Sequence, residues 1–226
     1  MVPSLTLGLA YHAKVELSRA KTLHPTAQKL VDTVIEMLET TSYKNIKSEN
    51  VLLRSGISRG PLYHHFANFD DLIETAQAQI YVGHISLVVN ELIRIAKKTN
   101  DPYEAQMILR NFVINQAVTY SSNNYGQRIG IIYNATFVPS LKAKLINSQE
   151  ELTQQWISVY QLFVAKGWAD PAIDTRGVSI LMQSTFIGRV LDELSDIHME
   201  PQVWGEVLTV LIDSFFFRLV PRENVG

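Results

Sequence analysis

The spacing of apolar residues along this chain is mostly that of α-helices, in which every third or fourth side chain returns to the same face. The first stripe follows Thr26 and consists of Leu30, Val31, Val34, Ile35 and Leu38. Similar stripes predict a long helix from Asn68 to Lys98 and others after Pro102, from Pro139 to Gly167, from about Asp174 to Leu194 and from Pro201 to Arg218. The stretches SSNNYG, WADPAID and SDIHME are predicted loops, and a short apolar piece, Ile129 to Tyr133, follows the first of them. Strand signals are few, so the pattern predicts an all-α fold.

The segment KSENVLLRSGISRGPLYHHF, residues 47–66, is typical of two short helices joined by a tight turn. Val51 can face inward from the first helix, and Gly56 sits where the chain must turn sharply. Ile57 and Leu62 can then close a small core between the two helices. This is the layout of a helix-turn-helix, whose second helix can enter the major groove of DNA.

The second helix of this segment carries most of the predicted DNA contacts. Ser58 is expected to cap it, and Pro61 is tolerated because it lies in the first turn. Adjacent histidines on a helix point about 100° apart, so they cannot bind one metal ion together, and no metal site is predicted. The residues expected to meet DNA are Lys44, Lys47, Ser58, Arg59, Gly60, Pro61, Tyr63, His64 and His65.

The elements GIS, RGPLYHHF and DDL, between Tyr43 and Leu72, resemble the DNA-binding domain of the TetR family of bacterial transcriptional regulators. The resemblance implies a three-helix helix-turn-helix domain at residues 26–72, preceded by an N-terminal extension, residues 1–25, that is either a helix or a basic arm. It also implies a larger C-terminal helical domain, residues 73–226, for ligand binding and dimerisation. Lys47, Ser48 and Phe69 depart from the family pattern, and the last replaces a lysine that generally touches a phosphate in relatives.

Charge and composition modify this interpretation only slightly. The chain has a net charge of −2, but residues 44–66 hold four basic side chains, Lys44, Lys47, Arg54 and Arg59, against Glu49 alone. With 226 residues, 46% of them apolar, the chain can bury a core, and with no cysteine it can form neither a disulfide nor a thiolate metal site. No run of about 18 apolar residues indicates a membrane span, so we expect a cytoplasmic protein without membrane contact.

The last two predicted helices are apolar on more than one side and therefore need two partners. The second partner is plausibly the same pair of helices from another copy of the chain, which would form a four-helix interface about a two-fold axis. Gly188 would allow a close helix approach there. Two recognition helices related in this way would read the half-sites of a palindromic double-stranded operator.

The family resemblance further implies a repressor that a small molecule releases, with the long helix from Asn68 carrying the change to the DNA-binding domains. No Arg or Lys cluster lies among the central segments, which favours a small, mainly hydrophobic effector. Aromatic side chains at helical spacing are more often core residues than pocket walls. The aromatic candidates for the pocket are Phe112, Tyr120, Tyr125, Tyr133, Phe137, Trp156, Tyr160 and Phe186, and the polar ones are His84, Asn115, Gln116, Asn134 and Gln183.

Two other classes of function compete with this one. Asp192 with Glu193 and His198 with Glu200 could serve an enzyme, but the sequence has no glycine-rich phosphate loop, no nucleophile elbow and no HExxH motif. We therefore predict no catalytic residues and no cofactor. A dimeric DNA-binding scaffold without an effector is the second alternative, and a C-terminal domain without a cavity would favour it.

Overall fold

The computed structural model describes residues 23–119, 122–192 and 194–220, and all their regular structure is helical, which confirms the all-α prediction. None of the helices in these ranges is long and apolar enough to cross a membrane. The predicted N-terminal extension lies almost wholly outside the described residues. The α-helices are α2 (Pro25–Leu38), α3 (Ser48–Ser55), α4 (Arg59–His65), α5 (Phe69–Lys98), α6 (Pro102–Thr119), α7 (Ser122–Ala135), α8 (Pro139–Ala165), α9 (Thr175–Asp192) and α10 (Pro201–Phe216), with a short 3-10 helix, η2, at Tyr43–Asn45.

The described chain divides into two compact units. The first unit comprises the residues up to Leu87 together with Ile131–Gln149, and the second comprises Val88–Gly130 together with the residues from Glu150 onward. The predicted domain boundary after residue 72 is not tested by this division and stays a prediction.

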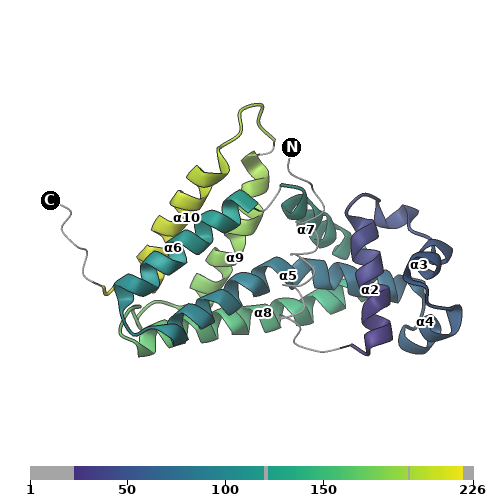
Figure 1. Cartoon of the computed structure of the whole chain (residues 1–226), viewed down its shortest axis with the longest axis horizontal. Helices are drawn as coiled ribbons and strands as arrows, with labels where there is room; N and C mark the ends of the chain where they lie inside the picture. The colour runs from purple at the N-terminus through teal and green to yellow at the C-terminus, as the bar shows by residue number, and fades with distance from the viewer. Residues whose placement is uncertain (1–22, 120–121, 193, 221–226) are drawn as a thin grey trace. The chain divides into compact units, whose positions relative to one another are not determined.

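In the first unit, α2 packs against both α3 and α4 to form a three-helix head (Figure 1). Four residues of the predicted α2 stripe are buried and the last, Leu38, is partly buried, and Val51 and Leu62 meet the stripe with no exposed surface. Leu72 and Ile73 of α5 belong to the same core, so the first turns of α5 are part of the head's packing. The core fixes the angle between α3 and α4, because the inward residues of both helices, Val51 and Leu62, pack in it.

The start of α5 is held by a reciprocal cap and by contacts to α8. Asn68 Oδ1 accepts the Asp71 N–H at 2.8 Å, as the preference of asparagine for helix N-caps predicts, and Asp71 Oδ2 accepts the Ala67 N–H at 2.9 Å. Asp71 also pairs with Lys144 of α8 at 2.5 Å. Burial raises the pKa of Asp71, but the hydrogen bonds from Lys144 and Ala67 outweigh burial and leave the pKa below its ordinary value.

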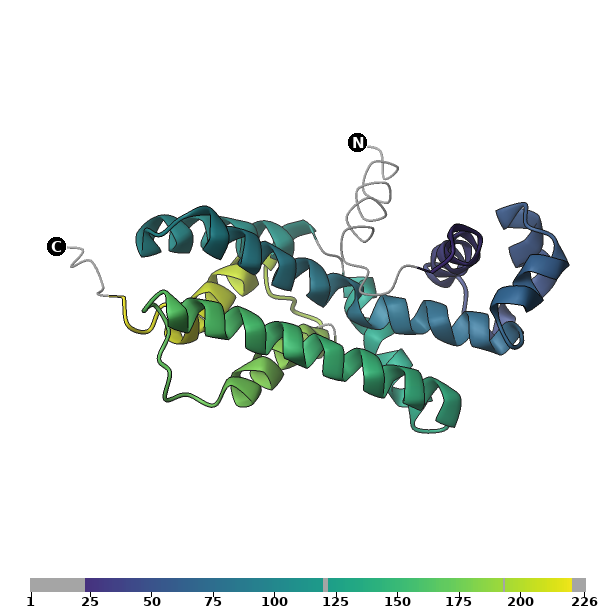
Figure 2. The same cartoon turned by 90° about the horizontal axis from the view of Figure 1, so that it is seen from below.

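In this unit the first turns of α5 and α8 lie side by side (Figure 2). Ser140 Oγ donates to Glu74 at 2.5 Å, and Tyr81 OH donates to Gln149 at 2.5 Å. With the Asp71–Lys144 ion pair, these contacts fix α8 against the helix that enters the head.

The second unit has an aromatic core built from α8, the segment after it and the end of α10. Edge-to-face contacts with ring centroids 5.1–5.5 Å apart connect Phe163 to Trp168, Phe216 and Phe217, and Trp168 stacks on Phe217 at 5.7 Å. Gly167, with φ +74°, makes the left-handed turn that brings Trp168 back onto Phe163. This confirms the prediction that Gly167 ends a long helix begun at Pro139.

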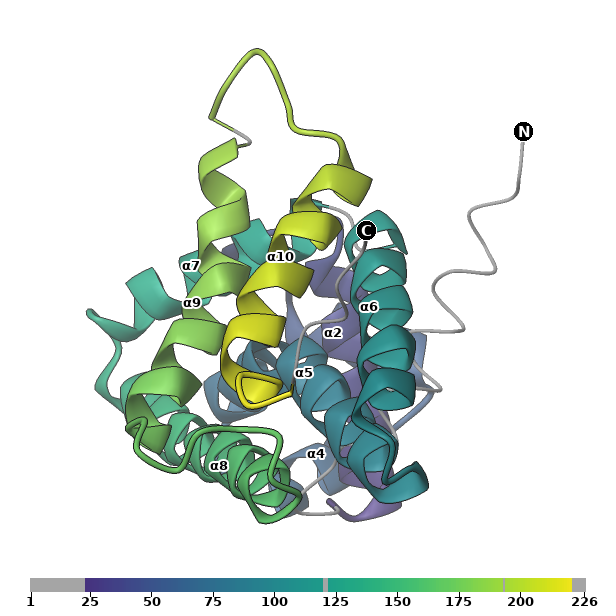
Figure 3. The ribbon, with the colours of Figure 1, turned by 90° about the vertical axis from the view of Figure 1, so that its left-hand side faces the viewer.

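Helix α10 packs closely along α6 (Figure 3). A Cβ added to Gly205 would lie 2.8 Å from Ile114 Cα and 3.2 Å from Ala117 Cβ, so only glycine fits here without displacement. Arg110 of α6 and Asp213 of α10 form an ion pair at 2.5 Å near the end of the same contact. Within the described chain no atom lies within 4 Å of a Cβ added at Gly188, and the close approach expected there, to a second copy, stays a prediction.

One predicted loop was wrong. Residues Ser122 to Gly126 of the stretch SSNNYG lie inside α7, which continues to Ala135 and includes the apolar piece from Ile129 to Tyr133. The helix takes in this polar stretch because Ile131 and Ala135, one turn apart, are buried against Tyr81, Leu141 and Leu145. Tertiary packing at the end of α7 therefore overrides the weak helix propensity at its start.

Candidate DNA-binding surface

Helix α4 presents one polar face to solvent. Leu62 is fully buried and fixes the inner side of the helix. Arg59, Gly60, Tyr63 and His64 recur at the i, i+1, i+4 and i+5 positions and are all exposed, with half of the Tyr63 surface accessible. Tyr63 therefore does not fill the seam between the helices, and its ring and hydroxyl are available to a partner.

The turn that presents this face depends on Gly56 and Ser55. Gly56 has φ +66°, the left-handed conformation predicted for it. Ser55 is buried, and its hydroxyl donates to the Leu52 carbonyl at 3.3 Å and accepts the Ile57 N–H at 3.2 Å. Ser58 occupies the N-cap position of α4 but makes no side-chain capping hydrogen bond, so that part of the prediction was wrong. Ser55 supplies the side-chain hydrogen bonds of the turn in its place.

Two of the predicted DNA-contacting lysines make no ion pair with any residue that the structure describes. Lys44 and Lys47 are both exposed, and Lys47 precedes α3 without a side-chain cap. Exposed ammonium groups without a carboxylate partner can approach phosphates at little cost in lost contacts. Both lysines flank the same head that carries α4.

The arginines of the head differ from the lysines, because each has an acidic neighbour. Arg54 pairs with Glu36 at 3.1 Å, and Arg59 lies 3.6 Å from Glu49 across the turn. The pKa of Glu49 is below its ordinary value because its own backbone N–H and the Ser48 hydroxyl donate hydrogen bonds to it, with a smaller effect of the Arg59 charge. The Arg59 pair is exposed on both sides, so it is weak and can open for another anion.

Three histidines meet at one edge of the head. The His24 and His65 rings stack with centroids 4.8 Å apart, and the His64 ring meets His65 edge-on at 4.9 Å. Burial, followed by the charges of His24 and His64, lowers the pKa of His65. His65 is thus a packing residue beside α2, whereas His64 stays on the outer face of α4.

The predicted effector-binding residues of the second unit differ in their burial and in their contacts. Trp156 and Tyr160 are buried against Phe216 in the aromatic core, with ring centroids at 6.2 and 5.5 Å, and the Tyr160 hydroxyl donates to the Asp170 carbonyl at 3.0 Å. Gln183 is also buried and donates to Ser179 Oγ at 3.2 Å. Phe112, Gln116 and Phe186 are partly buried, and Asn115 is exposed.

Three further candidates belong to the first unit, and the rest are not described. Tyr133 and Phe137 are 63% and 69% exposed and contact each other edge-on at 5.1 Å. Asn134 lies between them in sequence and is partly buried. Tyr120 and the side chains of His84 and Tyr125 lie outside the described residues.

Two of the groups that could have suggested an enzyme, Asp192 and His198, make local structural contacts, while Glu193 lies outside the described residues. The Asp192 carboxylate pairs with Arg189 at 2.5 Å and accepts the Met199 N–H at 3.0 Å, and the His198 ring is hydrogen-bonded to the Asp192 carbonyl at 3.0 Å. These contacts close the loop between α9 and α10.

Sequence reasoning missed two buried polar residues on α5. Glu74 and Gln77 are only 8% and 4% exposed. Both interrupt the apolar stripe that runs through Ile73, Ala76 and Ile80, and a polar residue on an apolar stripe was the available signal.

Comparison with solved structures identifies the fold. No family model matches the chain, and no curated protein matches it in sequence. A protein from Rhodococcus sp. assigned to the TetR family of transcriptional regulators superimposes with a TM-score of 0.65 at 13% identity, over 84% of this chain and 98% of that one. NemR of E. coli superimposes with a TM-score of 0.61 at 10% identity, over 84% of this chain and 97% of NemR. A TetR transcription regulator from Haloarcula marismortui superimposes with a TM-score of 0.58 at 10% identity, over 84% of this chain and 97% of that protein.

Proposed function

We propose that this chain, which has the fold of TetR-family transcriptional regulators, is itself a sequence-specific DNA-binding regulator. The observation that carries the proposal is the exposed face of α4, where Arg59, Tyr63 and His64 project from a helix held rigidly by the head's core. On this proposal, α4 enters the major groove, and Lys44 and Lys47, which precede α3, contact phosphates beside it. Pro61 shapes the first turn of the helix, and Gly60 lets the DNA backbone approach closely.

We further propose that the chain acts as a homodimer through α9 and α10. Ile180, Ile187 and Leu191 of α9 recur at helical spacing, as do Val203, Val207 and Val210 of α10. These six side chains are between 37% and 71% exposed. Two apolar stripes of this kind are costly in water, and a second copy related by a two-fold axis would cover them with the same surface.

A single charged residue in the stripe tests the dimer. Val207→Asp is expected to convert the protein to a monomer in analytical ultracentrifugation, because it places a carboxylate at the centre of the proposed interface. Met107→Asp is the control, since Met107 is 60% exposed on α6 and lies outside both stripes. A Val207→Asp protein that sediments as the wild type does would refute this interface.

The regulator is proposed to be a repressor whose operator binding is released by a small, mainly hydrophobic effector. Support comes from Trp156, whose indole Nε1 is buried and has no hydrogen-bond partner in the described chain. Buried donors are nearly always satisfied in proteins, so an acceptor on a bound molecule is the proposed partner. Phe112, Gln116 and Phe186, all partly buried in the same unit, would complete the site.

DNA selection from a random pool by the purified protein tests the function. We expect a palindromic consensus, and we expect Arg59→Ala combined with Tyr63→Ala to abolish its retention while helicity and dimer mass are unchanged. The control pair is Lys142→Ala with Tyr103→Ala, an exposed cation and an exposed tyrosine outside the head. Undiminished affinity in the head variant would refute α4 as the reader.

A screen for small molecules that release the selected DNA then tests the effector. Release by apolar compounds, lost in Trp156→Phe, is the expected result, since phenylalanine keeps the aromatic packing and removes the indole donor. A protein that no compound releases would instead fit the scaffold without an effector.

A further inference from the structure

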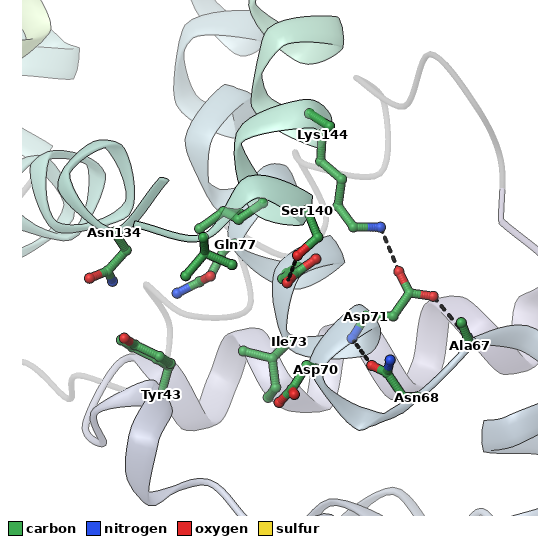
Figure 4. Close-up of a pocket in the computed structure, with 14 residues that line it drawn as sticks. Tyr43, Ala67, Asn68, Asp70, Asp71, Ile73, Gln77, Asn134, Ser140 and Lys144 are labelled. Carbon is green, nitrogen blue, oxygen red and sulfur yellow. Dashed lines mark hydrogen bonds and ion pairs between the residues drawn. The ribbon is translucent and has the colours of Figure 1, made fainter. Parts of the chain in front are cut away.

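The first unit contains a hollow of about 730 Å³ beside the head. Its walls come from Tyr43 of the head, from Ile73, Glu74 and Gln77 on the first turns of α5, and from Asn134 and Leu141 near the junction of α7 and α8 (Figure 4). The Asp71–Lys144 ion pair and the Ser140–Glu74 hydrogen bond close one side of it. A space of this size holds a drug-sized molecule.

One buried polar side chain is aimed into the hollow without a partner. Gln77 is 4% exposed and makes no hydrogen bond with any residue in the described parts of the chain. Figure 4 shows its amide directed into the space that Asn134 and Tyr43 border. The amide borders the open space of the hollow and not a protein partner, so its donor and acceptor are available to a molecule bound there.

The charge around the hollow is negative. Glu74 is 8% exposed, accepts one hydrogen bond from Ser140 and forms no ion pair with a described residue. Lys144 does not offset this carboxylate, because its ammonium is already paired with Asp71 at 2.5 Å. Asp70 adds a further, exposed carboxylate at the rim. A buried carboxylate needs an ionic partner more than an exposed one does, and a cation supplied from outside would provide it.

The remaining walls are apolar. Ile73 and Leu141 are almost fully buried, and both line the hollow. A hydrated metal ion or a simple ammonium ion would leave these walls without contacts, whereas a molecule with an apolar body would cover them.

We propose that this hollow binds a small organic cation with an apolar body. The ammonium group meets Glu74, the Gln77 and Asn134 amides bind polar groups on the same molecule, and the body lies on Ile73 and Leu141. The site differs from the effector site around Trp156, which belongs to the second unit. Because its occupant contacts both Tyr43 of the head and the start of α5, it would bias the orientation of α4, and this regulatory consequence alone rests on the proposed function.

The experiment is isothermal titration of the full-length protein, without DNA, using three probes that share one ring system. We expect 1-naphthylmethylamine, a cation at neutral pH, to bind at least ten-fold more tightly than neutral 1-naphthylmethanol, and we expect 1-naphthoate not to bind. Equal affinity for the amine and the alcohol, or no binding of any probe, would overturn the proposal. The titration contains no DNA, so a failed DNA selection would leave its result interpretable.

Three variants distinguish binding of the amine in the hollow from non-specific attraction of a cation to the protein surface. Glu74→Gln keeps an acceptor for Ser140 and removes the charge, so it should weaken amine binding at least ten-fold and abolish the preference over the alcohol. Gln77→Leu keeps the volume and removes the amide, and it should weaken the amine even if the first variant folds poorly. Glu151→Gln removes an exposed carboxylate of α8 and should change nothing. Equal losses in Glu74→Gln and Glu151→Gln would contradict a built site.

Discussion

The phosphate contacts of the head can be tested through the salt dependence of DNA binding. The perturbation is Lys47→Ala. Lys47 is exposed, precedes α3 and forms no ion pair in the described structure, so its removal breaks no ion pair and leaves the head's core untouched. Any change in DNA binding therefore reports on a lost contact with DNA and not on misfolding.

The expected magnitude follows from the number of heads that bind. Each phosphate neutralised by a lysine adds about 0.9 to the slope of log affinity against log salt concentration. A dimer loses two such contacts when Lys47 is replaced, so the slope should fall by about 1.8. Raising the salt four-fold, from about 50 to about 200 mM, should then narrow the affinity gap between wild type and variant about twelve-fold.

Fluorescence anisotropy with a selected operator, recorded at four or more salt concentrations, measures this slope. Lys142→Ala is the matched control, because Lys142 is equally exposed but lies on α8 outside the head. A slope that Lys47→Ala leaves unchanged would refute the assignment of Lys47 to a phosphate. A fall of only about 0.9 would keep the contact but contradict two heads bound per complex.

Three further predictions concern stability, pH and affinity. In urea titrations, Gly205→Ala should lower the free energy of unfolding by about 1–3 kcal/mol, because its Cβ would lie 2.8 Å from a backbone carbon of α6. Gly130→Ala, whose Cβ would have no described atom within 4 Å, should raise the free energy of unfolding by up to about 1 kcal/mol. The unfolded chain takes up the His65 proton more readily than the folded one, so stability should fall as the pH drops through about 6.5, and His65→Gln should flatten this decline between pH 7.5 and 5.5. Glu49→Gln removes the carboxylate that Arg59 pairs with, so it should tighten operator binding several-fold at low salt. An operator affinity unchanged in anisotropy titrations would contradict this prediction.

Local signals in the sequence predicted several of the helix boundaries that the structure contains. Gly56 and Gly167 adopt positive φ, Pro139 begins α8, and Asn68 caps α5. Each of these features is decided by residues within one turn of the chain, which is why it can be read without knowing the fold. Ser58 shows the limit of this reasoning, because a residue type that favours a cap does not guarantee the hydrogen bond.

The exposed face of α4 could also be predicted, for a related reason. Once Leu62 is taken as the inward residue, the geometry of a helix places Arg59, Tyr63 and His64 on the outer side. The same reasoning could not give the partners of the arginines, since Glu36 lies on α2 and its approach to Arg54 depends on how three helices pack.

The hollow in the first unit depends on contacts that no local pattern encodes. Ser140 and Glu74 are 66 positions apart in the sequence, and Lys144 and Asp71 are 73 apart. The aromatic residues were the obvious candidates for a binding site, yet Tyr160 packs in a core and Phe137 lies on the surface. A buried aromatic ring is already stabilised by apolar neighbours and so carries little information about ligands.

A buried amide or carboxylate carries more information, because its burial costs free energy unless something satisfies it. Gln77 sits four residues after Ile73 and three before Ile80, on the face of α5 that the head and α8 cover. A chain selected only for stable packing would place an apolar residue there, as it does at Leu72 and Ala76. The polar interruption of an otherwise apolar stripe is therefore the sequence feature that supports the proposed binding site in the first unit.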